Sequence, residues 1–294
     1  MTRLLRCALL ALAAGAGDPA RAQEVPLVRT ALTGSVFAYP VADGDTLGSV
    51  SARFGAGVAA IVELNGIRRQ DKLVPGQVLT IDNRHLAVVE SRFQITLNIP
   101  QRLLFLVEGD TVSAYPIAVG LRSWPTPVGG FTVVDKEENP TWDVPVSIQE
   151  EMRAQGKPVI TRMPPSPENP LGAHWIRTSL PGIGIHGTIA PSSIYNFASH
   201  GCIRVHPDDV ALLYMRVEIG APGASIYRPI TIARIDDRVF VEAHPDGYKR
   251  GPLGLAHVQA MAERDGYAEM VDWPAVERVL RLQRGLAVDV TKDE

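Results

Sequence analysis

Cysteine is scarce in this chain, which has only two among its 294 residues, Cys7 and Cys202. Cys7 lies in a short apolar run that follows two arginines and precedes an Ala-x-Ala sequence ending at Ala22. This arrangement is typical of a cleaved export signal, so we predict that residues 1–22 are removed. The mature chain then keeps one thiol, at Cys202, which excludes an internal disulfide and leaves a reactive thiol, a metal ligand or an intermolecular bridge.

Excess charge and long apolar runs are also lacking. The chain has 29 Lys and Arg against 32 Asp and Glu, a formal net charge of −3. A chain without a basic excess is poorly suited to the phosphate backbone, so we expect no nucleic-acid partner. After the N-terminal signal, no run is long and apolar enough to span a bilayer, so we expect no transmembrane span in the mature chain.

Glycine and proline are abundant instead. The chain contains 26 glycines and 23 prolines, and 46% of its residues are hydrophobic. Such a composition predicts many turns and short strands around a substantial core. The length indicates about two domains.

Residues 37–82 have a pattern of their own. A strand-like run leads to Asp45 or Thr46 as a helix cap, then to two short helical stripes, and a second strand follows Pro75-Gly76. The expected order is strand, helix, helix, strand. This stretch resembles a LysM module, a family that binds the glycan strands of peptidoglycan or chitin. The matching residues are Tyr39, Val41, Gly44, Asp45, Thr46, Leu47, Phe54, Ile61, Asn65, Leu73, Pro75, Gly76, Leu79 and Ile81.

The rest of the chain has two further regions with different sequence patterns. Residues 95–229 contain strand-like runs such as "RLLFLV" and "GGFTVVDK", and helical spacing returns only in "HPDDVALLYMRV". This pattern predicts a mainly β domain with a short helix. Residues 230–294 predict a hairpin followed by two short helices, which would form a partly helical C-terminal extension.

Three histidines and Cys202 lie close together between His186 and His206. A thiol becomes a nucleophile where a nearby base or cation stabilises its thiolate. Gly201 lets the backbone approach a substrate closely, and the amides beside it can face a developing oxyanion. The alternative is a zinc site, since zinc binds Cys and His, but one residue between His200 and Cys202 is too short for the usual ligand spacing. We therefore expect no metal.

The string "IHGTIAPSSIYNFASHGCIRVHP" resembles the signature of YkuD-type L,D-transpeptidases, which is His-Gly-x, a gap, and Ser/Thr-His-Gly-Cys-hydrophobic-Arg. The segments "TPVGGF" and "NPLG" also resemble elements of this family, in particular its ErfK/YbiS branch, which pairs the catalytic domain with a LysM module. The resemblance implies a YkuD-like β-sandwich or barrel over residues 95–229. The small α+β LysM module would occupy residues 37–82.

The resemblance also implies roles for individual residues. Cys202 would be the nucleophile and His186 its base, with the carbonyl of Gly187 orienting the imidazole. The residues expected to bind substrate or the oxyanion are His200, Gly201, Arg204 and Ser199. From the residues alone, Arg204 fits a structural ion pair equally well, and Ser199 a structural hydrogen-bond donor. His206 precedes Pro207 at a helix start, where a cap is expected.

The implied reaction is acyl transfer in the periplasm, at the cell wall, without a cofactor. Cys202 would attack the carbonyl on the L-centre of diaminopimelate in a tetrapeptide stem and release D-alanine. The acceptor would be another diaminopimelate amine, a lysine of an outer-membrane lipoprotein, or water, the last giving a carboxypeptidase. The competing hypothesis is a non-enzymatic peptidoglycan-binding envelope protein, in which the LysM module binds glycan and the β domain is a scaffold.

Overall fold

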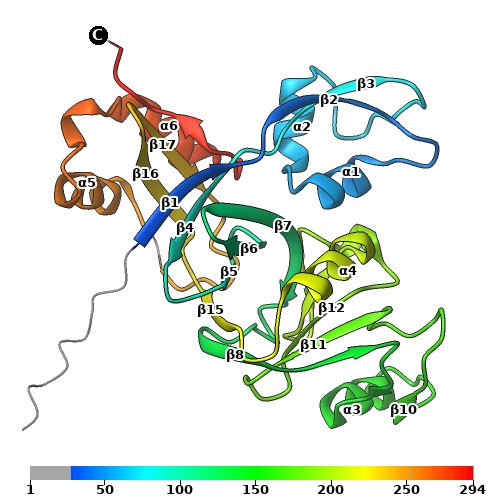
Figure 1. Cartoon of the computed structure of the whole chain (residues 1–294). Helices are drawn as coiled ribbons and strands as arrows, with labels where there is room; N and C mark the ends of the chain where they lie inside the picture. The colour runs from blue at the N-terminus through cyan, green and yellow to red at the C-terminus, as the bar shows by residue number, and fades with distance from the viewer. Residues whose placement is uncertain (1–27, 252, 294) are drawn as a thin grey trace, which may run out of the picture.

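The small unit in the upper right of Figure 1 has the predicted order of strand, helix, helix and strand. This computed structural model describes residues 28–251 and 253–293, so the predicted export signal lies outside the described residues. The unit consists of β2 (Val36–Pro40), α1 (Leu47–Phe54), α2 (Val58–Leu64) and β3 (Val78–Asp82). Strands β2 and β3 pair antiparallel. Of the two cap candidates, Thr46 caps α1. The Thr46 hydroxyl accepts from the Ser49 amide, and the Ser49 hydroxyl accepts from the Thr46 amide.

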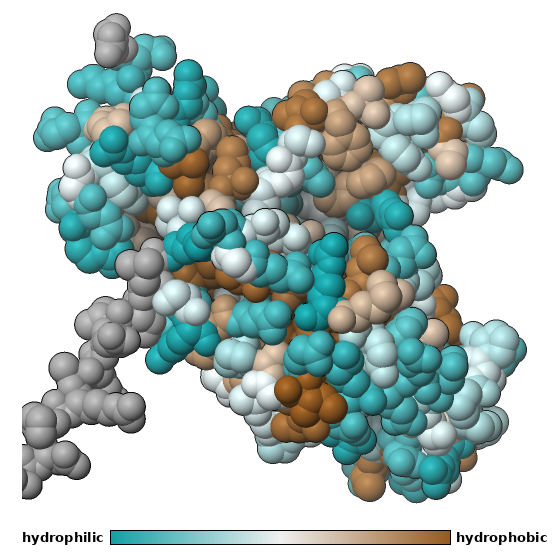
Figure 2. Space-filling view, in the orientation of Figure 1, coloured by the Kyte–Doolittle hydropathy of each residue, from teal (hydrophilic) through white to brown (hydrophobic). Residues whose placement is uncertain are grey.

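Apolar side chains of the small unit lie both inside and outside it. Its core contains Val50, Ile61 and Leu79, each at most 1% exposed. Figure 2 shows brown, apolar surface on the same lobe, and its exposed residues include Val36, Leu64, Val74 and Val78. In the described part of the chain no single helix is long and apolar enough to cross a membrane; the bent pair of α1 and α2 passes that test only together.

The central body is a nine-stranded sheet with the order β13-β7-β14-β12-β11-β8-β15-β5-β6. An additional pairing of β6 with β7 closes the sheet into a barrel, with β13 beside β7. The strands are β5 (Ile95–Asn98), β6 (Leu103–Glu108), β7 (Thr111–Gly120), β8 (Gly129–Glu138), β11 (His174–Thr178), β12 (Gly184–His186), β13 (Phe197–Ser199), β14 (Ile203–Val205) and β15 (Pro222–Ile226). Helix α4 (Pro207–Arg216) and the 3-10 turn η1 (Pro191–Ser193) complete the body. The expected mainly β domain with a short helix is confirmed.

A separate insertion projects from the barrel between strands β8 and β11. It contains β9 (Trp142–Asp143), α3 (Val146–Ala154) and β10 (Arg162–Met163), with β9 and β10 paired antiparallel. We call residues 141–163 the flap. It projects at the lower right of Figure 1, beside the barrel.

The C-terminal extension is a lobe with its own core rather than a loose tail. It comprises β16 (Ile230–Ile235), β17 (Arg238–Ala243), α5 (Leu255–Arg264), η2 (Ala268–Met270), α6 (Trp273–Leu282) and β18 (Val288–Asp289). The hairpin and two helices expected from the sequence are present. Val239, Val241, Val258 and Val276 are fully buried between the sheet and the helices. The ribbon of β1 (Val28–Thr33) and β4 (His85–Glu90) packs beside this sheet.

A buried polar joint connects the small unit, strand β4 and the C-terminal lobe. Nδ1 of His85 lies 2.8 Å from the Glu242 carboxylate, and Nε2 lies 3.0 Å from the Gly55 carbonyl oxygen of the small unit. Glu242 also accepts from the Leu86 amide at 2.6 Å and from His244 at 2.6 Å. Both ring nitrogens of His85 thus face oxygen atoms, one from each of two other segments of the chain.

Candidate active site

Two short parallel strands bring the predicted catalytic side chains to one face. In the pairing of β12 with β14, Ile185 lies opposite Ile203 and His186 lies opposite Arg204. Side chains alternate along a strand, so Ile185 and Ile203 point into the barrel core while His186 and Arg204 share the other face. Cys202 lies two residues before Arg204 and therefore faces the same side. The period of the sheet thus places thiol, imidazole and guanidinium together.

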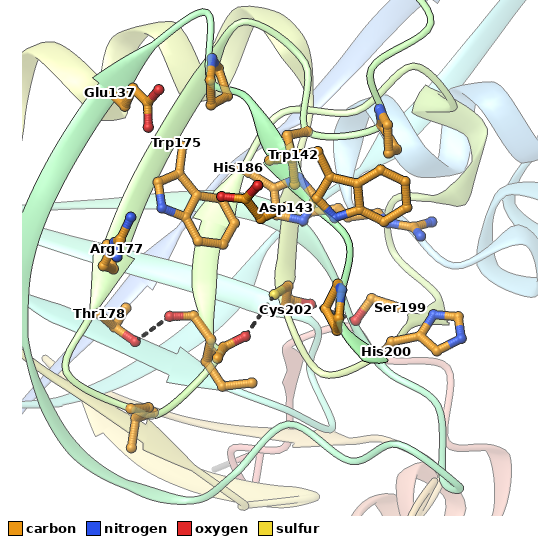
Figure 3. Close-up of a pocket in the computed structure, with 18 of the residues that line it drawn as sticks. Glu137, Trp142, Asp143, Trp175, Arg177, Thr178, His186, Ser199, His200 and Cys202 are labelled. Atoms are coloured by element: carbon orange, nitrogen blue, oxygen red, sulfur yellow. Dashed lines mark hydrogen bonds between the residues drawn. The ribbon is translucent and has the colours of Figure 1, made fainter. Parts of the chain in front are cut away.

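These side chains line one cavity of about 580 Å³. Figure 3 shows His186 between the Trp175 and Trp142 rings, with Cys202 below them, and all four residues line the cavity. Of the residues expected at the site, His186, Ser199, His200, Cys202 and Arg204 line the cavity. The other two, Gly187 and Gly201, lie next to lining residues and contribute backbone groups.

His186 is held as a neutral imidazole. It is 4% exposed, and its Nδ1–H donates to the carbonyl oxygen of Gly187 at 2.7 Å. Because that oxygen only accepts, the proton of the neutral ring sits on Nδ1, and Nε2 is the nitrogen with a lone pair that can accept a proton. Burial, followed by the nearby Arg204 charge, lowers the pKa of His186 from 6.5 to about 4. The group is therefore an uncharged base at neutral pH.

Cys202 is held as a thiol. Its Sγ donates to the Gly182 carbonyl oxygen at 3.4 Å. Burial raises the pKa of Cys202, against smaller opposing effects of a backbone hydrogen bond from Gly184 and of the Arg204 charge. A preformed thiolate is thus disfavoured, and a base must remove the proton as the sulfur attacks.

The turn before Cys202 is fixed by Ser199. The Ser199 hydroxyl donates to the carbonyl oxygen of Cys202 and accepts from the Gly201 amide at 3.2 Å. Gly201 has φ of +107°, a value that side-chain-bearing residues rarely adopt, and its carbonyl accepts from Thr126 at 2.8 Å. Ser199 therefore makes the contacts of a structural donor. The Gly201 amide is engaged by Ser199, which leaves the Cys202 amide as the candidate of the two for binding an oxyanion.

Arg204 is a half-buried cation that faces the cavity. Its guanidinium donates a long hydrogen bond, 3.4 Å, to the Ser193 hydroxyl. Within residues 28–251 and 253–293, no ion pair to an acidic side chain involves Arg204, so the structural ion pair considered from sequence does not form there. Burial lowers the pKa of the guanidinium. An unpaired cation in a cavity wall is suited to a ligand carboxylate.

Family comparisons agree with this geometry. A family model described as the L,D-transpeptidase catalytic domain matches residues 92–232, and one for the LysM domain matches residues 39–82. The probable L,D-transpeptidase YcfS of Escherichia coli K12 is 31% identical over 270 residues, 86% of this chain and 82% of that protein. This chain belongs to the L,D-transpeptidase family. The resemblance to YkuD-type enzymes with a LysM module is confirmed.

Other L,D-transpeptidases are similar to larger or smaller parts of this chain. The probable L,D-transpeptidase ErfK/SrfK of Salmonella typhimurium is 28% identical over 87% of this chain and 85% of that protein. The putative L,D-transpeptidase YkuD of Bacillus subtilis is 31% identical over 60% of this chain and 90% of its own. Among solved structures, L,D-transpeptidase 3 from Mycobacterium tuberculosis is 19% identical, covering 53% of this chain and 76% of that chain, with a TM-score of 0.35.

Several residues of this L,D-transpeptidase site were missed from sequence. Glu151 of α3 lies 2.6 Å from Nε2 of His200, and the His200 ring also lies 5.4 Å from the ring of Trp124. Trp175 lies 5.6 Å from the His186 ring. The pairing that places Trp175 opposite His186 is seen only in the structure, and nothing local in the sequence marked Glu151 or Trp124.

His206 does what its position predicted. It is the N-cap of α4, and its side chain accepts from the Asp208 amide at 3.4 Å. It also contacts Arg53 of the small unit at 2.8 Å and lies outside the cavity lining. His206 therefore serves the helix and the junction between units.

One described group of side chains has the composition of a metal site, but it lies at the buried joint. His85, Glu242 and His244 place one candidate ligand atom each within 4.8 Å of one another. Their nitrogen–oxygen distances of 2.6 and 2.8 Å are hydrogen-bond lengths. Ligand atoms around tetrahedral zinc lie about 3.3 Å apart, so this group fits hydrogen bonding better than a metal.

Proposed function

We propose that this enzyme is a peptidoglycan L,D-transpeptidase with Cys202 as nucleophile and His186 as base. The donor would be a tetrapeptide stem, attacked at the carbonyl on the L-centre of diaminopimelate. The observation that carries the proposal is a neutral, buried imidazole, oriented by the Gly187 carbonyl, on the same face of the sheet as a protonated thiol. The Gly187 carbonyl completes a triad that needs no acidic side chain.

The proposed chemistry is a two-step acyl transfer. The Sγ proton passes to Nε2 of His186 while the sulfur bonds to the carbonyl carbon. The C–N bond to D-alanine then breaks, and the departing amine takes that proton. In the second step an acceptor amine attacks the thioester carbon and loses a proton through His186 to the sulfur as the C–S bond breaks. The energy of the amide is kept in the thioester, so no cofactor or ATP is needed.

Arg204 is proposed to bind a carboxylate of the stem peptide. Its guanidinium faces the cavity with no acidic partner among the described residues. Stem peptides carry free carboxylates at diaminopimelate and at the terminal D-alanine. A partly desolvated Arg–carboxylate pair would fix the donor relative to Cys202. His200 would act with it in shaping the site.

The small unit is proposed to hold the enzyme on glycan strands. A hollow of about 560 Å³ lies between its two loops and is lined by Asp45, Thr46, Leu47, Gly48, Val58, Arg69, Asp71, Lys72 and Leu73. A Cβ added at Gly48 meets only the Thr46 hydroxyl, at 3.7 Å. Gly48→Trp should therefore fold, fill the hollow and weaken binding to intact sacculi. Unchanged sacculus binding would argue against this hollow as the glycan site.

The proposed organisation places the signal at residues 1–22, the LysM module at 37–82, the catalytic domain at 95–229 and the extension at 230–294. The location would be the periplasm, at the cell wall. The acceptor is proposed to be an amine, either of diaminopimelate, giving a 3→3 crosslink, or of a lipoprotein lysine. Water would give L,D-carboxypeptidase activity. Incubation with defined muropeptides and a lysine-bearing lipoprotein, followed by mass analysis of products, separates these acceptors.

The decisive experiment is intact-protein mass spectrometry during turnover, or with a carbapenem as an acylating probe. Wild-type protein should gain one adduct at Cys202. Cys202→Ser should gain none, and His186→Gln should acylate much more slowly because the thiol has lost its base. The double variant should be little worse than either single one, since the two residues act as a unit.

His206→Ala is the matched control, a histidine of the same stretch that caps a helix outside the cavity. It should acylate at close to the wild-type rate. Full acylation of His186→Gln, or inhibition of the wild type by a chelator, would refute the proposed mechanism. Sacculus binding without any adduct would support the non-enzymatic alternative.

A further inference from the structure

The flap forms one wall of the cavity. Five of its residues line the space opposite the catalytic strands: Thr141, Trp142, Asp143, Pro145 and Ile148. Figure 3 shows Trp142 directly over the cavity that contains Cys202. A substrate in this cavity would therefore contact both the barrel and the flap.

The flap is held together largely by itself. Its two strands pair through Asp143 with Arg162 and Trp142 with Met163. The side-chain amide of Gln149 donates back to the Val144 carbonyl at 2.8 Å. None of the residues of α3 is fully buried. Little apolar burial thus fixes this helix to the barrel, and its position depends on a few polar contacts.

One such contact joins α3 to the catalytic loop. Oε2 of Glu151 lies 2.6 Å from Nε2 of His200, two residues before Cys202. Its other oxygen accepts from Gln155 at 2.9 Å, which orients the carboxylate toward His200. Among the hydrogen bonds of the described residues, this is the one that connects a side chain of α3 to a residue outside the flap.

We propose that Glu151 is a positioning residue that acts through His200, tethering the flap to the loop that carries Cys202 and keeping the cavity wall closed on bound substrate. The inference rests on the proposed function for its effect on turnover, but the tether itself does not. The Trp124 ring, whose centroid lies 5.4 Å from that of the His200 ring, limits where the imidazole can move. The Glu151 carboxylate therefore holds the flap against a His200 ring whose own movement is restricted.

The chain offers a graded test. Glu151→Ala removes the tether, whereas the amide oxygen of Glu151→Gln can still accept from Nε2–H of His200 and should keep part of it. Glu150→Ala is the control, because Glu150 is an exposed acid on the same helix outside the cavity lining. Full-length variants are compared by hydrogen–deuterium exchange of residues 146–154 and by KM and kcat for a soluble tetrapeptide muropeptide.

Glu151→Ala should speed exchange across α3 and raise KM about three- to tenfold with a smaller change in kcat. This size is expected for a charge-assisted hydrogen bond between side chains that are 28% and 40% exposed. Glu151→Gln should fall between Glu151→Ala and the wild type. Glu150→Ala should match the wild type in both measurements.

The outcomes separate the tether from the reaction. Unchanged exchange of α3 in Glu151→Ala overturns the inference, whatever the kinetics. Faster exchange with an unchanged KM overturns the positioning role. Faster exchange in a protein whose wild type shows no turnover refutes the proposed function while supporting the tether.

Discussion

The low pKa of His186 gives a sharp prediction for the pH dependence of the enzyme. Because the base must be neutral to accept the thiol proton, kcat/KM should fall only when His186 becomes protonated. With its pKa at about 4, the acid limb should lie near pH 4, about 2.5 units below that of an ordinary histidine. Replacing Arg204 with methionine removes the second cause of this lowering and keeps the first, which is burial.

The size of the change follows from those two causes. Burial is the larger of the two causes of the lowered pKa. Removing the Arg204 charge should therefore move the acid limb up by about one pH unit, and not by the full difference between about 4 and 6.5. At pH 5, kcat/KM should then be about nine-tenths of its plateau in the wild type and about half of its plateau in Arg204→Met. The plateau itself should also fall, since Arg204 is proposed to bind substrate, but the position of the limb is independent of its height.

Burying His186 as a neutral group also makes stability depend on pH. Its folded-state pKa is lowered, so the unfolded chain binds more protons as the pH falls from about 6.5 to about 4. The contribution of His186 to the free energy of unfolding is fully present above pH 6.5. It falls by about 3 kcal/mol as the pH is lowered to 4. Rates must therefore be measured within the range where circular dichroism shows folded protein.

The assay measures kcat/KM of the wild type and Arg204→Met between pH 3.5 and 8, each expressed relative to its own plateau. Arg177→Met is the control. Arg177 also lines the cavity but is not among the causes of the His186 shift, so its removal should leave the limb in place. NMR titration of the His186 ring provides the same pKa without turnover. A wild-type limb near pH 6.5, or an unmoved limb in Arg204→Met, would refute the reasoning.

Other predictions concern stability and processing. Glu242→Gln leaves two buried imidazoles facing a neutral amide, so the free energy of unfolding in urea should fall by about 3–5 kcal/mol. Burial would raise the pKa of Glu242 but its histidine partners lower it, so this stabilisation should be present at neutral pH and lost in acid. His206→Ala should cost about 0.5–2 kcal/mol in the same assay through loss of the α4 cap. N-terminal sequencing of the exported protein should begin at Gln23, and an intact Met1 would contradict the predicted signal.

Local chemistry explains what could be predicted from the chain alone. The Thr46 cap, the two short helices of the small unit and the His206 cap depend on residues within a few positions of one another. The grouping of His186 with Cys202 also followed from a short motif. Alternation along two strands then places their side chains on one face, so the sequence determined the chemistry of the site and its family.

Only the tertiary structure decided how that chemistry is tuned. The lowered pKa of His186 depends on burial beneath distant residues, which no local pattern encodes. Glu151 meets His200 across 49 positions, and Glu242 meets His85 across 157. That Arg204 has no acidic partner among residues 28–251 and 253–293 likewise depends on which acids fold near it. A sequence fixes the intrinsic properties of each side chain, whereas desolvation and long-range pairing arise only when the chain brings separate segments together.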